Sequence, residues 1–288
     1  MLANYNKRKI MHANNRGELM TFSFSFLTVF FIAVLGNKFI KKYAVGLYIF
    51  SAIISTILVI GTKFNLADKM PTLISNFVWY PFFKGSVAGA IFILVMIVSI
   101  LDNRSIIKKN LMSIRAELSI IASIFTLGHN FSMSQSYFDM LSNGYKNMPL
   151  NYFAASICSL IMFIIMIPLF ITSFKFVQSK MNSKRWKKLH KSAYIFYVLM
   201  YVHVVLLIFP KALSGNKIAI FNIIIYSTIF LIYGVLRIRK ALRNKLQLFQ
   251  LIPIAGIIVL LIFVSTIVMP TDTDVKEQPV SGATTNVK

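Results

Sequence analysis

Cysteine is almost absent from this chain, since Cys158 is the single one among 288 residues. One thiol cannot form a disulfide within the chain, and it cannot supply the ligands of a Cys-based zinc site or an iron–sulfur cluster. Cys158 lies inside an apolar run, where a small core residue is expected. These covalent and metal sites are therefore excluded within one chain.

Acidic residues are also scarce, because 8 Asp and Glu stand against 31 Lys and Arg and give a formal net charge of +23. Such an excess can indicate binding to nucleic acid. Here the positive residues fall in short runs between apolar segments, which is the positive-inside pattern of membrane proteins. We therefore expect no nucleic-acid partner.

The chain shows no glycine-rich phosphate loop and no dinucleotide fingerprint, and its polar stretches are short. Oxidation of NAD(P)H by the chain itself would need a soluble nucleotide-binding domain. We therefore expect that the chain does not oxidise NAD(P)H by itself.

Apolar residues dominate instead, with 57% hydrophobic residues and a mean hydropathy of +0.71. These values exclude an ordinary soluble globule and predict an all-α, polytopic membrane helical bundle of about eight transmembrane helices. The expected spans lie at about 20–36, 43–62, 87–101, 116–132, 153–174, 192–209, 218–236 and 248–269. The third and fourth are short and should extend into their flanks, and the first could instead be an uncleaved signal-like segment. Glu117 and Asp102 are expected at span ends, close to water.

Loop charge predicts how the bundle lies in the plasma membrane. The loops 102–115, 175–191 and 237–245 are rich in Lys and Arg, and they alternate with the poorer loops 133–152 and 210–217. The rich loops are therefore expected on the cytoplasmic side and the C-terminal tail outside. With eight spans the N-terminus would also lie outside, which its own basic cluster opposes, so either the first segment does not span or the rule fails there.

Three of the four histidines, namely His129, His190 and His203, lie in or beside apolar spans. Histidine is costly in hydrocarbon and usually faces a bundle interior or a cofactor. The last two are separated by roughly 20 Å along a helix, so that one lies near each membrane face. His129 is expected at the outer depth of His203, on a helix that runs the same way. Because imidazole is a strong iron ligand, this pair fits a bis-histidine haem between two helices, although a packing role is the alternative.

The inner level offers His190 no histidine partner. Arg115 precedes His129 by fourteen residues and so shares its helix face. It could contact a haem propionate or stand where a second inner ligand would be. On an ideal helix His190 and His203 face directions about 140° apart, so either the helix is locally irregular or the two sites lie on different sides of it.

Two runs resemble the ferric reductase-like transmembrane domain. RWKKLHKSAYIFYVLMYVH (185–203) resembles its W-x-x-LH-(K/R)-x-x-Y…H helix, and SIRAELSIIASIFTLGH (113–129) resembles its earlier ligand helix. The resemblance covers roughly residues 43–240. The family includes NADPH oxidases, ferric reductases and the MsrQ (YedZ) haem subunits. Arg115 stands where four-histidine members have histidine, and since MsrQ-like members resemble this chain in having arginine there, the closest likeness is to them.

This resemblance implies a six-helix core with b haem between its third and fifth helices, here the fourth and sixth spans. The outer pair, His129 and His203, matches the family pattern fully. His190 would be a ligand of an inner haem, in which Arg115 replaces a histidine, so the implied content is one haem b or two. The chain then divides into a basic N-terminal segment with the first apolar helix (1–42), the core (43–240), a last transmembrane helix (241–269) and an extracytoplasmic tail (270–288).

The tail contains Ser281-Gly282-Ala283-Thr284, which resembles the acceptor motif for covalent FMN in NqrC- and RnfG-type proteins. There a flavin transferase links the FMN phosphate to a threonine, so Thr284 would be the acceptor. The usual aspartate three residues before the serine is Gln278 here. The alternative is a flexible, Ser/Thr-rich end.

The sequence and the resemblance thus predict a transmembrane b-type cytochrome that is a component of an oxidoreductase. It would pass electrons from a cytoplasmic flavin reductase or a quinol outward through haem to an extracytoplasmic acceptor, with FMN on Thr284 as a relay. One alternative is an MsrQ-like haem subunit for a separate soluble reductase, with an unmodified tail. Another is a haem-free membrane transporter or scaffold.

Overall fold

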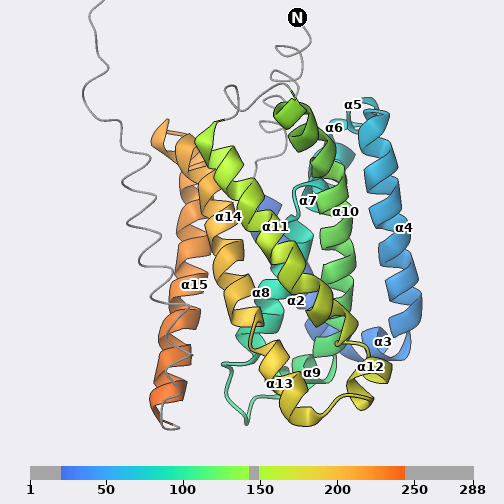
Figure 1. The fold of residues 1–288 in the computed structure, drawn as a ribbon, viewed down its shortest axis with the longest axis vertical. Coiled ribbons are helices and arrows are strands. Elements are labelled where there is room, and N and C mark those ends of the chain that lie inside the picture. The colour runs from blue at the N-terminus through green and yellow to red at the C-terminus, as the bar shows by residue number, and fades with distance from the viewer. Residues whose placement is uncertain (1–20, 143–148, 244–288) are drawn as a thin grey trace, which may run out of the picture.

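The computed structural model describes residues 21–142 and 149–243, and this part of the chain forms helices and no strand. In chain order the elements are α2 (Thr21–Leu35), α3 (Asn37–Lys42), α4 (Ala44–Lys63), α5 (Leu66–Lys69), α6 (Thr72–Ile74), the π-helical turn Ser75–Trp79, α7 (Tyr80–Phe83), α8 (Ser86–Val98), α9 (Ile106–Ser113), α10 (Arg115–Ser142), α11 (Leu150–Ile171), α12 (Lys175–Ser179), α13 (Ser183–His190), α14 (Ala193–Leu213) and α15 (Lys217–Arg243). The long helices form one bundle (Figure 1). The predicted all-α membrane bundle is confirmed.

Four helices are long and apolar enough to cross a membrane, and two bent helix pairs raise the number of candidate spans to six. The four are Ala44–Lys63, Leu150–Ile171, Ser183–Leu213 and Lys217–Lys240, and the pairs are Thr72–Phe83 with Ser86–Val98, bent by 56°, and Ile106–Ser113 with Arg115–Ser134, bent by 58°. The two expected spans that looked short therefore each gain a preceding helix across a sharp bend. These six correspond to the second to seventh predicted spans.

The first predicted span forms α2, a mostly apolar helix of 15 residues. Its Phe22 stacks on Tyr226 of α15 with ring centroids 4.0 Å apart. A helix of this length measures about 22 Å, less than the apolar core of a bilayer, which is about 30 Å thick. The described part of the first segment is therefore too short to cross by itself. The last predicted span, 248–269, lies outside the described residues.

The basic loops all lie at one end of the bundle. Figure 1 shows α3, α9, α12, α13 and the end of α15 together at its lower end, and α5 and α6 at the opposite end. Both α10 and α14 begin at this basic end and run away from it (Figure 1). The Lys- and Arg-rich loops, which alternate with poorer loops along the sequence, therefore lie together in the fold. That this end faces the cytoplasm stays a prediction.

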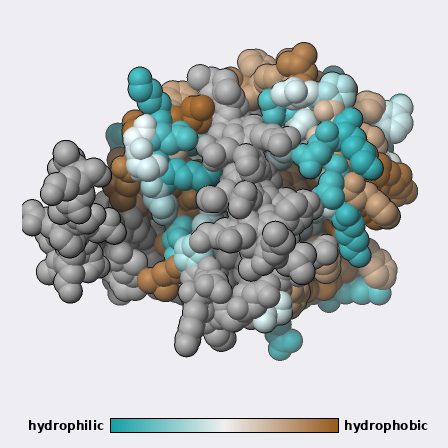
Figure 2. Space-filling model, turned by 90° about the horizontal axis from the view of Figure 1, so that it is seen from above, coloured by the Kyte–Doolittle hydropathy of each residue, from teal (hydrophilic) through white to brown (hydrophobic). Residues whose placement is uncertain are grey.

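The bundle buries its centre and exposes apolar side chains outward. Ten of the 13 residues of α8 are buried. The outer helix α4 instead exposes Ile49, Phe50 and Ile53 by more than half. Viewed along the helices from the end that carries α5 and α6, hydrophobic side chains lie around the margin (Figure 2). An apolar outer surface of this kind is suited to lipid rather than to water.

Small residues bring α4 and α10 close together, as is common between membrane helices. The Ser55 hydroxyl of α4 donates a hydrogen bond of 3.0 Å to the Ile124 carbonyl of α10. At Gly128 of α10, an added Cβ would lie 2.7 Å from the Cβ of Ser55. Since Gly128 directly precedes His129, this close packing also fixes the position of the histidine along the bundle.

We therefore expect Gly128→Ala to push α10 away from α4. Overpacking of a well-packed contact typically costs about 1–3 kcal/mol, so the midpoint of thermal unfolding in detergent should fall. The matched control is Gly46→Ala in α4, where an added Cβ meets nothing within 4 Å. Equal unfolding midpoints for both variants would contradict this view of the contact.

Candidate functional site

His129 is held by the junction between α7 and α8. Its Nδ1 lies 2.6 Å from the carbonyl oxygen of Phe83, the last residue of α7. Carbonyls in the last turn of a helix lack an amide partner within that helix. The bend between the two helices therefore leaves this carbonyl free to accept from an imidazole.

Gly85 gives the imidazole its place at this junction. It has a φ of +72°, a conformation that glycine adopts readily and other residues rarely do. A Cβ at this position would lie 3.2 Å from both Cγ and Cδ2 of His129. The missing side chain thus lets the histidine ring lie directly against the backbone of the junction.

His203 is held in the same way by another helix. Its Nδ1 lies 2.9 Å from the carbonyl oxygen of Ala155 in α11, the helix that packs most closely against α14. Ala155 is fully buried, and its small side chain permits this approach. A carbonyl oxygen has two lone pairs, so it can accept this hydrogen bond as well as a helical one.

The hydrogen bonds to Phe83 and Ala155 determine which ring nitrogen of each histidine can bind a ligand. A carbonyl oxygen only accepts hydrogen bonds, so in each neutral imidazole Nδ1 carries the proton and Nε2 keeps its lone pair. Metal-binding histidines commonly donate their other N–H to a backbone carbonyl or carboxylate in this manner, which orients the ring. Both side chains are only half-buried, although each lies within the bundle.

The two imidazoles also lie near each other in space, close enough to interact electrostatically. They come from α10 and α14, and each of these helices packs most closely on other neighbours, α10 on α4 and α8, and α14 on α11 and α15. His129 and His203 therefore come from two helices that each pack more closely on other helices than on each other. This is an arrangement in which a ligand between the two helices has a protein donor on each side.

The number of protein ligands limits what His129 and His203 can bind. Within 21–142 and 149–243, no group of three or more His, Cys, Asp or Glu side chains could bind a metal ion. Two imidazoles are few for a bare ion, but they suffice for haem iron, whose remaining ligands come from the porphyrin. The residues at this site therefore fit haem better than an ion held by protein ligands alone.

His190 is placed differently from the other two. It is the last residue of α13, its ring stacks on Trp186 with centroids 4.0 Å apart, and its Nε2 lies 3.0 Å from the hydroxyl oxygen of Thr172. That hydroxyl donates to the Pro168 carbonyl at 2.6 Å, so it accepts from the imidazole. Nε2 of His190 is therefore the protonated nitrogen, and any ligand would have to be bound through Nδ1.

Arg115 and His190 lie close enough to interact electrostatically at the basic end of the bundle, and their predicted roles at an inner haem stay predictions. The difference in direction between His190 and His203 also has a structural explanation. A turn at Lys191 and Ser192 separates α13 from α14, so an ideal helix does not connect the two histidines. The helix is locally irregular, which was one of the two alternatives.

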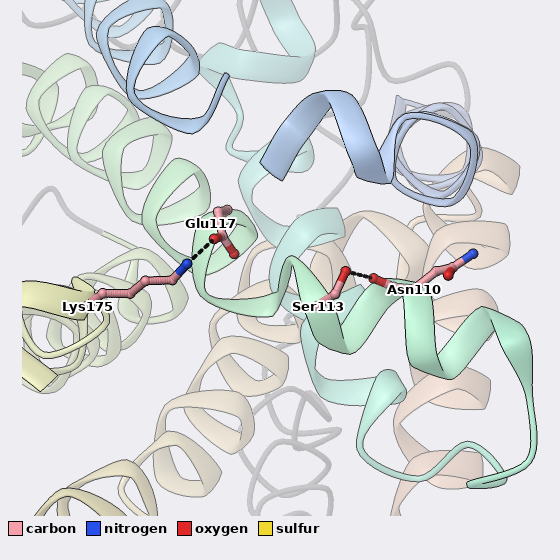
Figure 3. A network of polar contacts seen from close by, with 4 residues as sticks. All are labelled: Asn110, Ser113, Glu117 and Lys175. Carbon is pink, nitrogen blue, oxygen red and sulfur yellow. Dashed lines mark hydrogen bonds and ion pairs between the residues drawn. The ribbon is translucent and has the colours of Figure 1, made fainter. Parts of the chain in front are cut away.

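Glu117 lies in the first turn of α10 and is not exposed to water as its place at a span end suggested. Its side chain is nearly fully buried, and one carboxylate oxygen lies 3.6 Å from Nζ of Lys175 at the start of α12 (Figure 3). Asp102, by contrast, is exposed as expected. The lysine of this ion pair is exposed, and the pair links the basic end of α10 to the segment that leads into α13.

Sequence reasoning missed the groups that position the histidines. Phe83 and Ala155 act through backbone carbonyls, and Thr172 through a hydroxyl, so no side-chain motif marks them. Gly85 is the exception, because a glycine between two apolar segments signals a turn. His12 and Thr284 lie outside the described residues, so the predicted flavin site stays a prediction.

Comparison with known proteins supports a ferric reductase-like transmembrane region. The matching family is described as "Ferric reductase like transmembrane component", and residues 84–202 match it. This range contains Arg115, His129 and His190 and stops one residue short of His203, so it is narrower than the resemblance over 43–240. No solved structure gives a significant match to the chain.

One relative is an "Uncharacterized protein" from Treponema pallidum (strain Nichols). It is 34% identical over 231 residues, which make up 78% of this chain and 62% of the relative. The chain thus spans less than two thirds of that relative's length. With the six candidate spans, these findings indicate a multi-pass membrane protein with a region typical of membrane electron-transfer components. The likeness to MsrQ-type subunits stays a prediction.

We expect Gly85→Ala to displace the ring of His129 and to weaken haem retention by about ten-fold, a typical effect of disturbing the groups around a metal ligand. The matched control is Gly215→Ala, because Gly215 also has a positive φ, +81°, but an added Cβ there meets nothing within 4 Å. The measurements are the haem-to-protein ratio and the electron paramagnetic resonance g values of the oxidised protein. A change of equal size in both variants would show that backbone strain, and not contact with His129, is responsible.

Proposed function

We propose that this protein is a transmembrane b-type cytochrome that passes electrons from its basic end toward the opposite side of the membrane. The observation that carries this proposal is the matched state of His129 and His203. Each donates Nδ1–H to a backbone carbonyl and keeps Nε2 for a ligand, and the two rings interact across α10 and α14. Haem bound there would supply a one-electron carrier within the apolar part of the bundle.

The surroundings of the histidines support this role. The Phe83 and Ala155 carbonyls hold the two rings from different sides, so the ligand atoms are oriented before any group binds. The outer surface of the bundle is apolar and suited to lipid, so a cofactor between the spans would lie within the apolar layer of the membrane. A site of this kind favours electron transfer over reactions that need bulk water.

At the inner level we propose one role for each of the two polar residues. Arg115 supplies a positive charge near the basic end, suited to a haem propionate. His190 is fixed by Thr172 and Trp186 and interacts with this arginine, so its first role is to position the lower part of the site. Haem content near one per chain is therefore expected, and a second haem at His190 is the alternative.

The donor and the acceptor are proposed as separate molecules. A cytoplasmic flavin reductase or a membrane quinol would supply electrons at the basic end, which we assign to the cytoplasmic side of the plasma membrane. An extracytoplasmic acceptor would receive them, directly or through FMN carried on Thr284 by a flavin transferase. The family match at residues 84–202 supports the electron-transfer class without distinguishing these partners.

The histidine assignment predicts that His129→Ala and His203→Ala each lose most of the haem, whereas His190→Ala retains about one haem per chain, because each b haem needs both axial ligands. The measurement is a reduced-minus-oxidised absorption spectrum with a haem-to-protein ratio on purified protein that elutes as a single species. Full haem retention in His203→Ala would overturn the assignment. No haem in the unmodified protein, from cells able to make it, would favour the haem-free transporter or scaffold.

The flavin assignment predicts that the intact mass of the protein, produced together with a flavin transferase, increases by one FMN. Thr284→Ala should lose this increase, and Thr285→Ala is the matched control that should keep it. In-gel fluorescence of the flavin provides a second measurement. If the mass of the protein without substitutions does not increase, an MsrQ-like subunit with an unmodified tail is favoured. The haem assignment would be unaffected.

A further inference from the structure

Two lysines meet at the basic end of α8. Lys108 of α9 donates from Nζ to the Leu101 carbonyl and to Oδ1 of Asn103, both at 2.6 Å. Lys240 of α15 donates to the Ser99 carbonyl at 2.8 Å. Lys240 also lies close enough to Lys108 to interact with it directly. Two ammonium groups from different helices are therefore held side by side.

Arg237 adds a third positive charge from the same face of α15, three residues before Lys240. Its guanidinium lies over the ring of Tyr194, 5.1 Å from the centroid, and donates a hydrogen bond to the tyrosine hydroxyl. Its Nε is buried, and it has no hydrogen-bond partner within the part of the chain that the structure describes. One donor of the cluster is thus left for something else.

None of these three cations pairs with a carboxylate among the described residues. Their partners are carbonyl, amide and hydroxyl oxygens, all of them neutral. The buried acid Glu117 pairs with Lys175 (Figure 3), and the exposed Asp102 accepts from the backbone N–H of Arg104. A cluster of three cations is therefore left without an opposite charge from those parts of the protein.

Two simpler explanations account for part of the cluster only. The positive-inside rule explains basic residues in a loop, but such residues normally extend into water, as the neighbouring Lys109 and Arg239 do. Lys108 is instead buried, with 8% of its surface exposed. Lysines can also cap the last carbonyls of a helix, but a helix C-terminus carries only about half a negative charge, which does not balance three cations.

We propose that Lys108, Arg237 and Lys240 form a binding site for a phosphate anion, supplied by the headgroup of an anionic membrane lipid. A phosphate group presents several acceptor oxygens and suits both a guanidinium and ammonium donors. Basic sites between membrane helices on the cytoplasmic side are known to hold such headgroups.

A lipid is favoured over free phosphate by the apolar surface beside the cluster. Ile106 is 75% exposed on the same short helix as Lys108, and Leu236 is exposed next to Arg237. Acyl chains attached to the bound headgroup would cover these side chains. The proposal does not depend on haem, so it can hold or fail independently of the proposed function.

The test uses the whole protein, stripped of lipid in detergent and then mixed with micelles that contain either phosphatidylglycerol or phosphatidylcholine. Native mass spectrometry counts the lipids bound per chain, and thermal unfolding reports stabilisation. We expect preferential retention of phosphatidylglycerol, and a loss of about five-fold in affinity for each cation removed by Lys108→Gln, Arg237→Gln or Lys240→Gln. Lys108→Arg keeps the charge and should retain the lipid even where Lys108→Gln folds poorly.

The matched controls are Lys109→Gln and Arg239→Gln, which remove the exposed neighbours and should leave retention unchanged. Inorganic phosphate in lipid-free detergent distinguishes the source. If it stabilises the protein to the same extent and the same three variants abolish this, the site binds soluble phosphate and the lipid assignment is wrong. Equal effects of cluster and control substitutions, or no preference between the two lipids, would overturn the proposal altogether.

Discussion

A bilayer offers no water to the polar groups of a protein, so every such group within a span needs a partner inside the molecule. His129 and His203 meet this requirement through backbone carbonyls, and that choice shapes the elements around them. The span that passes through α7 and α8 bends by 56° where the Phe83 carbonyl is released. Glycine suits the bend because Gly85 has a positive φ and because a Cβ there would make a tight contact, 3.2 Å, with the ring of His129. The broken helix is thus a consequence of holding an imidazole in hydrocarbon.

The same constraint separates the two ends of the bundle. Charged groups lie at both ends of the bundle, including Lys69 of α5. At the basic end Glu117 and Lys175 pair, and Lys108 donates to neutral oxygens. The middle of the bundle contains apolar side chains, the histidines, and hydroxyls that bond within their own helix or, like Ser55, to a neighbouring one. Under the proposed function, this division would leave the interior of the bundle to the haem and the ends of the spans to contacts with electron donors and acceptors.

Much of this could be predicted from the sequence, because lipid imposes strong patterns. Apolar runs located six described spans, and loop charge placed the basic segments at one end of the fold. Counting residues along the helices placed His129 at the depth of His203 and Arg115 near that of His190. In the structure the members of each pair lie close enough to interact electrostatically.

The rest depends on tertiary contacts that carry no local signal. The carbonyls of Phe83 and Ala155 come from residues whose side chains have no part in the contact. The bends before α8 and α10 change helix direction, and the turn between α13 and α14 interrupts the helix, where periodicity predicts continuity. The sequence also did not predict that Glu117 and Lys108 are buried, because hydropathy places both in loops or at span ends.

The helices of the bundle fall into two sets by their closest packing, with α2, α4, α8 and α10 in one set and α11, α14 and α15 in the other. His129 belongs to the first and His203 to the second. A cofactor coordinated by both His129 and His203 would link the two sets of helices. The two sets already share an apolar core, in which Phe22 of α2 stacks on Tyr226 of α15. A bound cofactor would add a second link between them and would stabilise the folded chain by its binding free energy.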